Sequence, residues 1–91
     1  MKYHWDARKA ASNLSKHGVS FEEAVTVFDD PLFVIFADPD HSVREKRFII
    51  MGESGRKRLL VVAYTERPNE IRIINARKAT HQEREVYEEE I

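Results

Sequence analysis

The stretch Leu59-Leu60-Val61-Val62-Ala63-Tyr64-Thr65 decides the fold. It is apolar at odd and at even positions, which is typical of a central β-strand that is covered on both faces. Segments with strand character also lie at 32–37, 47–52 and 70–76, separated by turns rich in Pro, Gly, Asn and Asp. Strands that follow one another in this way pair antiparallel, so this part of the chain predicts a sheet of three or four antiparallel strands.

Two helices are predicted ahead of this sheet, after a short β-prone segment, Tyr3 to Trp5, that is a candidate edge strand. Asp6 suits the N-cap of the first helix, and Lys16-His17-Gly18 suits its C-terminal end. The apolar residues of this helix recur at the spacing of one helix face: Ala7, Ala10, Ala11 and Leu14.

The second helix begins at Ser20-Phe21-Glu22-Glu23, which has the form of a capping box, with the serine bonding forward and Glu23 reaching back. Asp29-Asp30-Pro31 ends it, because proline cannot continue the helical hydrogen bonds. The break between the two helices is short, so we expect an antiparallel hairpin with one shared apolar face.

A third helix is predicted at the C-terminal end, where Thr80-His81-Gln82-Glu83 forms another capping box. Its apolar stripe is thin and consists of Val86, Tyr87 and Ile91, so we expect a helix that is loosely docked or completed by a partner. The sequence thus predicts a single α+β domain over residues 1–91. In it an N-terminal helix hairpin packs on a three- to four-stranded antiparallel sheet, with a C-terminal helix.

Charge is strongly segregated along the 91 residues, although the net charge is only −1. Residues 1–40 carry 4 Lys/Arg against 7 Asp/Glu, residues 41–82 carry 10 against 4, and residues 83–91 carry 1 against 5. A basic middle segment fits a polyanion, because phosphate contacts supply much of the affinity for nucleic acids. A solvated sheet surface gives the same pattern, so charge alone leaves both interpretations open.

Several classes of protein are disfavoured by what the sequence lacks. It has no cysteine, no apolar run near the roughly 20 residues that span a bilayer, and no signal-peptide pattern at its start. We therefore expect a soluble, cytoplasmic protein without membrane contact. The histidines, His4, His17, His41 and His81, lack the close spacing of paired metal ligands, and no phosphate-binding glycine loop occurs, so neither a metal site nor a cofactor is predicted.

Short blocks of sequence follow one another in a fixed order between residues 3 and 87. They are Trp5-Asp6, Asn13-Leu14, Lys16-His17-Gly18-Val19-Ser20-Phe21, Phe28-Asp29-Asp30-Pro31, Arg47-Phe48 with Gly52, and Ile71-Arg72-Ile73-Ile74-Asn75-Ala76-Arg77 followed by Ala79-Thr80. This ordered set resembles the BrnT family of type II toxin–antitoxin toxins. No block is specific alone, whereas their order is.

This resemblance implies a fold similar to that of RelE-like toxins and a ribonuclease activity that needs no metal and inhibits translation. It also implies a cognate, BrnA-like antitoxin that carries a DNA-binding segment, so that DNA is contacted only through the antitoxin.

Cleavage of RNA makes modest demands on a protein, because the attacking 2′-hydroxyl belongs to the substrate. The protein must take up one proton, supply another and neutralise charge on the phosphorane, a role that suits guanidinium groups. Arg47, Arg72 and Arg77 lie in or just beyond predicted strands and form a phosphate clamp if they converge on one sheet face. The alternative is that each is a solvated or salt-bridged arginine.

His41 is the first choice for acid or base, because loops carry catalytic groups readily and histidine exchanges protons near neutrality; the alternative is a loop histidine satisfied by Asp40. Glu45 and Glu66 flank strands and are further choices for the base, unless each pairs with an arginine. Tyr64 is either a catalytic hydroxyl or a core residue. RNA contacts are predicted for Lys46, Arg67 and Trp5, the last by stacking on a base unless its ring belongs to the core.

Two functions therefore compete. In the first, the chain is an endoribonuclease, and Arg77→Ala abolishes cleavage without unfolding the protein. In the second, it is a non-catalytic protein-binding module that acts in a DNA-bound repressor complex. In either case we expect a partner to cover the basic face or to complete the packing around Val86, Tyr87 and Ile91.

Overall fold

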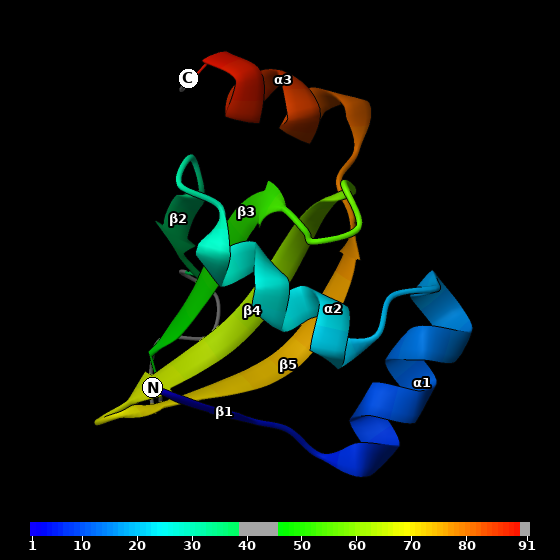
Figure 1. Cartoon of the computed structure of the whole chain (residues 1–91), viewed down its shortest axis with the longest axis vertical. Coiled ribbons are helices and arrows are strands. Elements are labelled where there is room, and N and C mark those ends of the chain that lie inside the picture. The colour runs from blue at the N-terminus through cyan, green and yellow to red at the C-terminus, as the bar shows by residue number, and fades with distance from the viewer. Residues whose placement is uncertain (39–45, 90–91) are drawn as a thin grey trace.

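The structure is a computed structural model that describes residues 1–38 and 46–89 of the chain (Figure 1). Its helical elements are α1 (Ala7–His17), α2 (Phe21–Thr26), a 3-10 turn η1 (Val27–Asp29) and α3 (His81–Glu89). Its strands are β1 (Lys2–His4), β2 (Val34–Ala37), β3 (Arg47–Glu53), β4 (Leu59–Arg67) and β5 (Glu70–Lys78). None of the described helices is long and apolar enough to cross a membrane.

The five strands form one mixed sheet in the order β1-β5-β4-β3-β2. The antiparallel pairing of the last four strands was predicted, but the prediction of a purely antiparallel sheet of three or four strands was wrong. β1 joins as a fifth strand and runs parallel to β5. No local turn signals that pairing, because most of the chain separates the two strands.

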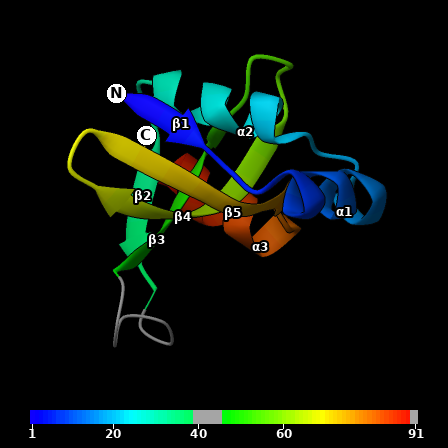
Figure 2. The same cartoon turned by 90° about the horizontal axis from the view of Figure 1, so that it is seen from below.

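Helices cover both faces of this sheet (Figure 2). On one face, α2 and η1 bury the main core, which includes Phe21, Val27, Ile50, Leu60, Val62 and Ile73. On the opposite face, Tyr87 of α3 packs against a smaller cluster of Met51, Leu59 and Val61. β4 lies between the two clusters and every residue from 59 to 65 is buried, as the apolar pattern on both parities predicted.

The expected helix hairpin is not formed as predicted, because α1 lies at the edge of the sheet beside β5 (Figures 1 and 2). The buried residue of α1 is Asn13, whereas Leu14 of the predicted apolar stripe is 53% exposed. The Asn13 amide nitrogen donates to the carbonyls of Val19 and Ala76 at 2.9 and 2.8 Å, and its oxygen accepts from the Ala76 amide at 3.0 Å. A polar side chain thus fixes the helix to a strand edge.

The predicted helix ends are largely confirmed. Asp6 accepts hydrogen bonds from the amides of Arg8 and Lys9 at the start of α1, and Gly18 ends it with a left-handed φ of 67°. The Ser20 hydroxyl accepts from the Glu23 amide at 3.0 Å, but the Glu23 carboxylate does not reach back to Ser20.

That carboxylate is buried instead against the turn that joins β3 to β4. The Ser54 hydroxyl donates to it at 2.7 Å, and the Arg58 guanidinium binds both of its oxygens. The hydrogen bond from Arg58 holds the pKa of Glu23 below its ordinary value. Glu23 therefore ties α2 to the β3–β4 turn, a contact that the local capping pattern does not signal.

The capping box of α3 is complete, because the Glu83 amide donates to Thr80 Oγ1 at 3.1 Å and the Thr80 amide donates to the Glu83 carboxylate at 2.8 Å. Tyr87 anchors this helix by packing on the second cluster and by donating from its hydroxyl to Asp30 at 2.6 Å. Val86 is exposed, and Ile91 lies outside the described residues.

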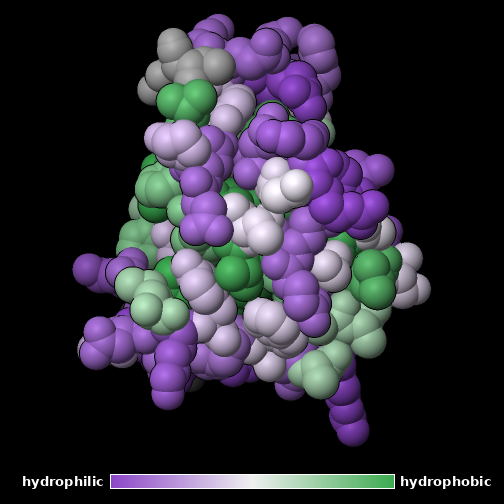
Figure 3. Space-filling view, viewed as in Figure 1, coloured by the Kyte–Doolittle hydropathy of each residue, from purple (hydrophilic) through white to green (hydrophobic). Residues whose placement is uncertain are grey.

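The β2 edge carries an apolar patch that the sequence did not single out. Its exposed side chains are Leu32, Phe33, Ile35 and Phe36. Figure 3 shows apolar colour on the side of the molecule where β2 lies, whereas the α3 end is largely hydrophilic. Among the described residues β2 pairs with β3 alone, so the outer peptide groups of this edge have no described strand partner and lie beside apolar side chains.

Candidate functional site

Four side chains form a row across the α3 side of the sheet, which we call the basic row. Directly paired residues share one sheet face, and the register aligns four strands at this level. The row consists of His4 on β1, Arg72 on β5, Thr65 on β4 and Arg47 on β3. Neighbouring strands lie about 4.8 Å apart, so the Cα atoms of the two arginines are roughly 10 Å apart.

Two of the three predicted arginines are thus brought together in one row. Arg47 and Arg72 are half-buried, and among the described residues the Arg47 guanidinium has no ion pair. Arg72 lies close enough to Asp6 to lower the pKa of that carboxyl, although backbone hydrogen bonds from Lys9 and Arg8 contribute more. No described helix packs over the row, because α3 contacts the cluster at the other end of β4.

Thr65 lies between the arginines and is almost fully buried, at 1% exposure. Its hydroxyl has no hydrogen-bond partner within the described part of the chain. An unpaired buried polar atom costs stability and needs a reason. The position of Thr65 between the strands that carry Arg47 and Arg72 suggests a reason, namely that the hydroxyl belongs to the same site as the two guanidinium groups.

His4, like Thr65, is a residue of the row that the sequence interpretation missed. Its Nε2 lies 3.5 Å from a carboxylate oxygen of Glu70, and the side chain is about one-third exposed although Nε2 itself is buried. At this distance Nε2 forms no hydrogen bond with a described residue, but the carboxylate would attract the protonated ring, and the other ring nitrogen is left for proton exchange. Only the parallel pairing of β1 with β5 places this histidine beside Arg72, so sequence spacing gives no signal for it.

Arg77 lies on the same face, where its position pairs with Val61. Both terminal nitrogens of its guanidinium bind the Glu83 carboxylate, at 2.7 and 2.8 Å. This ion pair was the alternative to a phosphate clamp, and it fixes the start of α3 to β5. In this arrangement both terminal nitrogens of Arg77 are engaged by Glu83, and its role in a phosphate clamp stays a prediction.

The Arg77–Glu83 pair predicts an acid-sensitive contribution to stability. Hydrogen bonding from Arg77 lowers the pKa of Glu83 to about 2, against about 4.3 for an unperturbed glutamate. Because the folded-state pKa is the lower one, the pair stabilises the protein above about pH 4.3 and this contribution fades as the pH falls toward 2. Melting temperatures of wild type and Glu83→Gln, followed by circular dichroism, should therefore differ at neutral pH and converge in acid.

Glutamine at position 83 retains the capping geometry, so the comparison isolates the charge. Glu85→Gln is the control, since Glu85 pairs only with the exposed His81 within the described residues. A melting difference that stayed constant from neutral pH to pH 2 would contradict this prediction.

The other predicted site residues lie apart from the basic row. Tyr64 faces the main core, stacked on Phe48 with ring centroids 5.6 Å apart, and burial together with Glu66 and Tyr3 raises the pKa of Tyr64 to about 12. Trp5 is half-buried edge-on against Phe21 at 5.9 Å. For both aromatic residues the structure supports the core interpretation.

The remaining predicted residues flank the row or fall outside the described residues. Lys46 is exposed immediately before β3, and Arg67 is exposed at the end of β4, two pairs beyond the row and opposite Glu70. Glu66 lies on the Tyr64 side of the sheet. His41 and Glu45 lie outside the described residues, so their predicted roles stay predictions.

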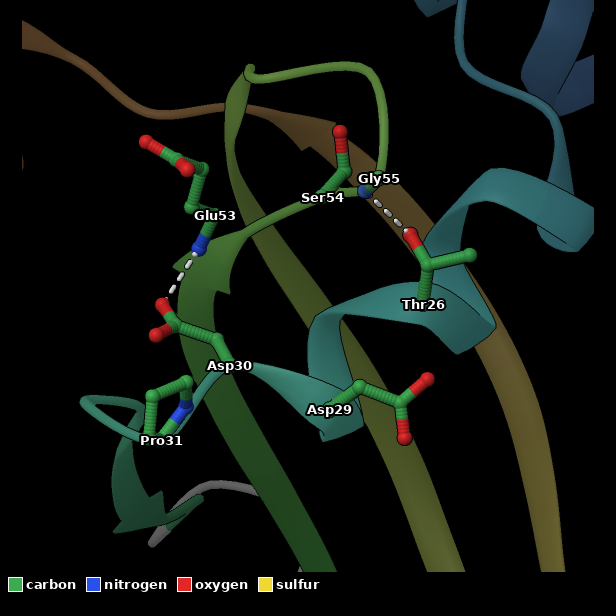
Figure 4. Close-up of a pocket in the computed structure, with 7 residues that line it drawn as sticks. All are labelled: Thr26, Asp29, Asp30, Pro31, Glu53, Ser54 and Gly55. Atoms are coloured by element: carbon green, nitrogen blue, oxygen red, sulfur yellow. Dashed lines mark hydrogen bonds between the residues drawn. The ribbon is translucent and has the colours of Figure 1, made fainter.

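A separate hollow near the start of β2 has the wrong charge for RNA (Figure 4). It is lined by Asp29, Asp30 and Glu53 together with Thr26 and the Ser54–Gly55 turn. Burial acts to raise the pKa of Asp30, but hydrogen bonds from Tyr87, Glu53 and Leu32 outweigh it and hold the pKa low. The Thr26 hydroxyl accepts from the Gly55 amide at 2.7 Å, so these polar groups hold η1, the turn and α3 together. Neither in this hollow nor anywhere else in residues 1–38 and 46–89 do three His, Asp or Glu side chains gather as a metal site would require.

Fold and site together define the class of protein: a small α+β chain with a five-stranded mixed sheet and a basic row on one face. A family described as "Ribonuclease toxin, BrnT, of type II toxin-antitoxin system" matches residues 5–83, and the chain belongs to this family. The crystal structure of the Brucella abortus ribonuclease toxin BrnT superposes with a TM-score of 0.70 at 21% identity, covering 89% of this chain and 99% of that one. At this identity the likeness concerns the fold. Among curated proteins no sequence matched.

Proposed function

We propose that this chain is an endoribonuclease that cleaves RNA at the basic row. The observation that carries the proposal is the alignment of His4, Arg72, Thr65 and Arg47 on one sheet face. Membership in a family of ribonuclease toxins supplies the class of reaction. The row supplies the two kinds of group that the reaction needs, a proton-exchanging ring and permanent positive charge.

The chemistry follows from these groups. A base removes the proton of the 2′-hydroxyl, whose oxygen attacks the adjacent phosphorus; the bond to the 5′-oxygen breaks, and that oxygen takes up a proton. Arg47 and Arg72 bind the non-bridging phosphate oxygens and offset the charge that develops on them. His4, whose Nε2 lies 3.5 Å from Glu70, takes the proton from the 2′-hydroxyl and delivers a proton to the leaving 5′-oxygen. The products are a cyclic phosphate and a free 5′-hydroxyl, and the protein's own groups suffice, so we propose that no metal is needed.

The biological role that we propose follows the family: cleavage of RNA inhibits translation in the cytoplasm until a cognate antitoxin neutralises the toxin. We propose a BrnA-like antitoxin with its own DNA-binding segment, so that the toxin meets DNA only in that complex. The exposed apolar side chains at the β2 edge support a protein partner. They also favour the second candidate function, a binding module without chemistry, which the cleavage assay separates from the first.

The test is cleavage of a defined single-stranded RNA by the purified chain in excess chelator. We expect wild type to cleave and His4→Gln to cleave about 100-fold more slowly, the lower end of what a general acid or base contributes. His81→Gln is the matched control, because His81 is exposed on α3 and pairs with Glu85, away from the row. No cleavage by folded wild type, with ribosomes present as well, would make the binding module the better interpretation.

A further inference from the structure

A second basic site lies at the seam between α1 and β5. Four residues of α1 that line it, Lys9, Ser12, Asn13 and Lys16, recur at the spacing of one helix face, and His17, Ile74 and Asn75 complete the lining. The hollow measures about 180 Å³, room for several water molecules at about 30 Å³ each. None of the residues that line it is acidic, and α1 contains no acidic residue between Ala7 and His17.

The sheet itself is irregular at this site. Ala63 pairs with Asn75 whereas the next residue, Tyr64, pairs with Ile73, so Ile74 is an extra residue that forms a bulge in β5. Bulges bend a strand and re-aim its side chains, and they are common beside functional sites. Here the bulge brings Asn75, which is exposed, to the rim beside the two lysines.

Asn13 explains why the hollow keeps its shape. Its amide is fully engaged by Val19 and Ala76, which fixes the distance between helix and strand while leaving the outer lining groups to face solvent. Lys9, Lys16 and His17 are all exposed. Two ammonium groups, an imidazole and an amide around a hollow without carboxylates suit an anion such as a phosphate group.

The site lies near the basic row along β5. Asp6, which caps α1, lies within electrostatic reach of both Arg72 and Lys9. Asn75 follows Arg72 by three positions on β5, a distance of about 10 Å. One strand of RNA bound at the row therefore passes the α1–β5 seam when it leaves over β5.

We propose that the hollow lined by Lys9, Lys16, His17 and Asn75 binds a backbone phosphate of the RNA next to the phosphate that is cleaved. This assignment rests on the proposed function, because it takes the basic row as the cleavage site. The two lysines act as point charges on the phosphate, and the Asn75 amide donates to it. The site holds the strand in register and contributes to binding without taking part in proton transfer.

The experiment measures binding of single-stranded 2′-O-methyl RNA, which lacks the attacking hydroxyl and is not cleaved. Fluorescence anisotropy over a series of salt concentrations gives the dissociation constant and its salt dependence. We expect Lys9→Ala/Lys16→Ala to bind about 10-fold more weakly, with a logarithmic salt slope smaller by about 0.7, the value for one phosphate of a single strand. Alanine is a good helix former, so both substitutions are compatible with α1.

Arg8→Ala is the matched control, because Arg8 lies on the same helix and carries the same charge but does not line the hollow. Wild-type binding by the Arg8 variant, with the double variant weakened, supports the site. Equal weakening in both variants would show a general effect of charge and overturn it, as would wild-type affinity and slope in the double variant. Wild type that binds this RNA but cleaves no RNA would instead overturn the proposed function alone.

Discussion

Arg72→Gln and Arg47→Gln are each expected to slow RNA cleavage by about 100- to 1,000-fold, the usual loss when one group that stabilises developing charge is removed. Both side chains lie in the basic row, and glutamine keeps much of the half-buried stem while removing the charge. Single-turnover rates on a defined RNA measure the effect. Arg72→Lys should recover only part of the rate, because an ammonium group does not grip two phosphate oxygens at once.

Arg84→Gln is the control for lost positive charge, since Arg84 is exposed on α3 and away from the row. A folded Arg72→Gln protein that cleaved at the wild-type rate would remove the basic row from the mechanism.

Arg77→Ala is less informative than the sequence suggested. It releases Glu83 and the start of α3, so a loss of cleavage in that variant does not locate the site.

Asn13→Leu is expected to lower the free energy of unfolding by about 3 kcal/mol or more, because three backbone groups lose their partners inside the protein. These are the Ala76 amide, the Ala76 carbonyl and the Val19 carbonyl. Leucine is close in size, so the loss reflects hydrogen bonding more than an empty cavity. A change of this size is a large part of the roughly 5–15 kcal/mol that stabilises a typical domain.

Urea unfolding followed by the fluorescence of Trp5, which packs on Phe21, measures this loss. Ser15→Ala is the control on the same helix; Ser15 is exposed, and its substitution should change stability by no more than about 0.5 kcal/mol. An Asn13→Leu protein as stable as wild type would mean that the three backbone groups find other partners.

Local patterns predicted much of this fold. The apolar run at 59–65 indicated a strand buried on both faces, and Asp6, Gly18 and Thr80 marked helix ends that the structure confirms. Predictions from local sequence patterns failed where a side chain binds a part of the chain that is distant in sequence. Glu23 looked like half of a capping box but binds Arg58, and α1 is held by a polar residue that an apolar-stripe argument cannot reveal.

The same limit applies to the site. Arg47 and Arg72 were predicted because both lie in predicted strands and guanidinium groups suit a phosphate, and the register places both in one row. His4 was missed because its neighbour across the sheet is remote in sequence. Lys9 and Lys16 gave no signal beyond ordinary helix charge, since only the docking of α1 beside the β5 bulge makes a hollow between them.

The two edges of the sheet differ in how well they are protected from pairing with a further strand. At one border β1 is only three residues long, and beyond it the Asn13 amide occupies the peptide groups of Ala76 as a neighbouring strand would. At the other, no strand in the described part of the chain pairs with the outer side of β2, which is flanked by the exposed side chains of Phe33, Ile35 and Phe36. Short or covered borders resist the addition of strands, and apolar ones invite it. An additional strand is therefore expected to pair with β2 more readily than with the opposite edge of the sheet. This holds whether the strand comes from a partner protein or from a second, misassembled copy of this chain.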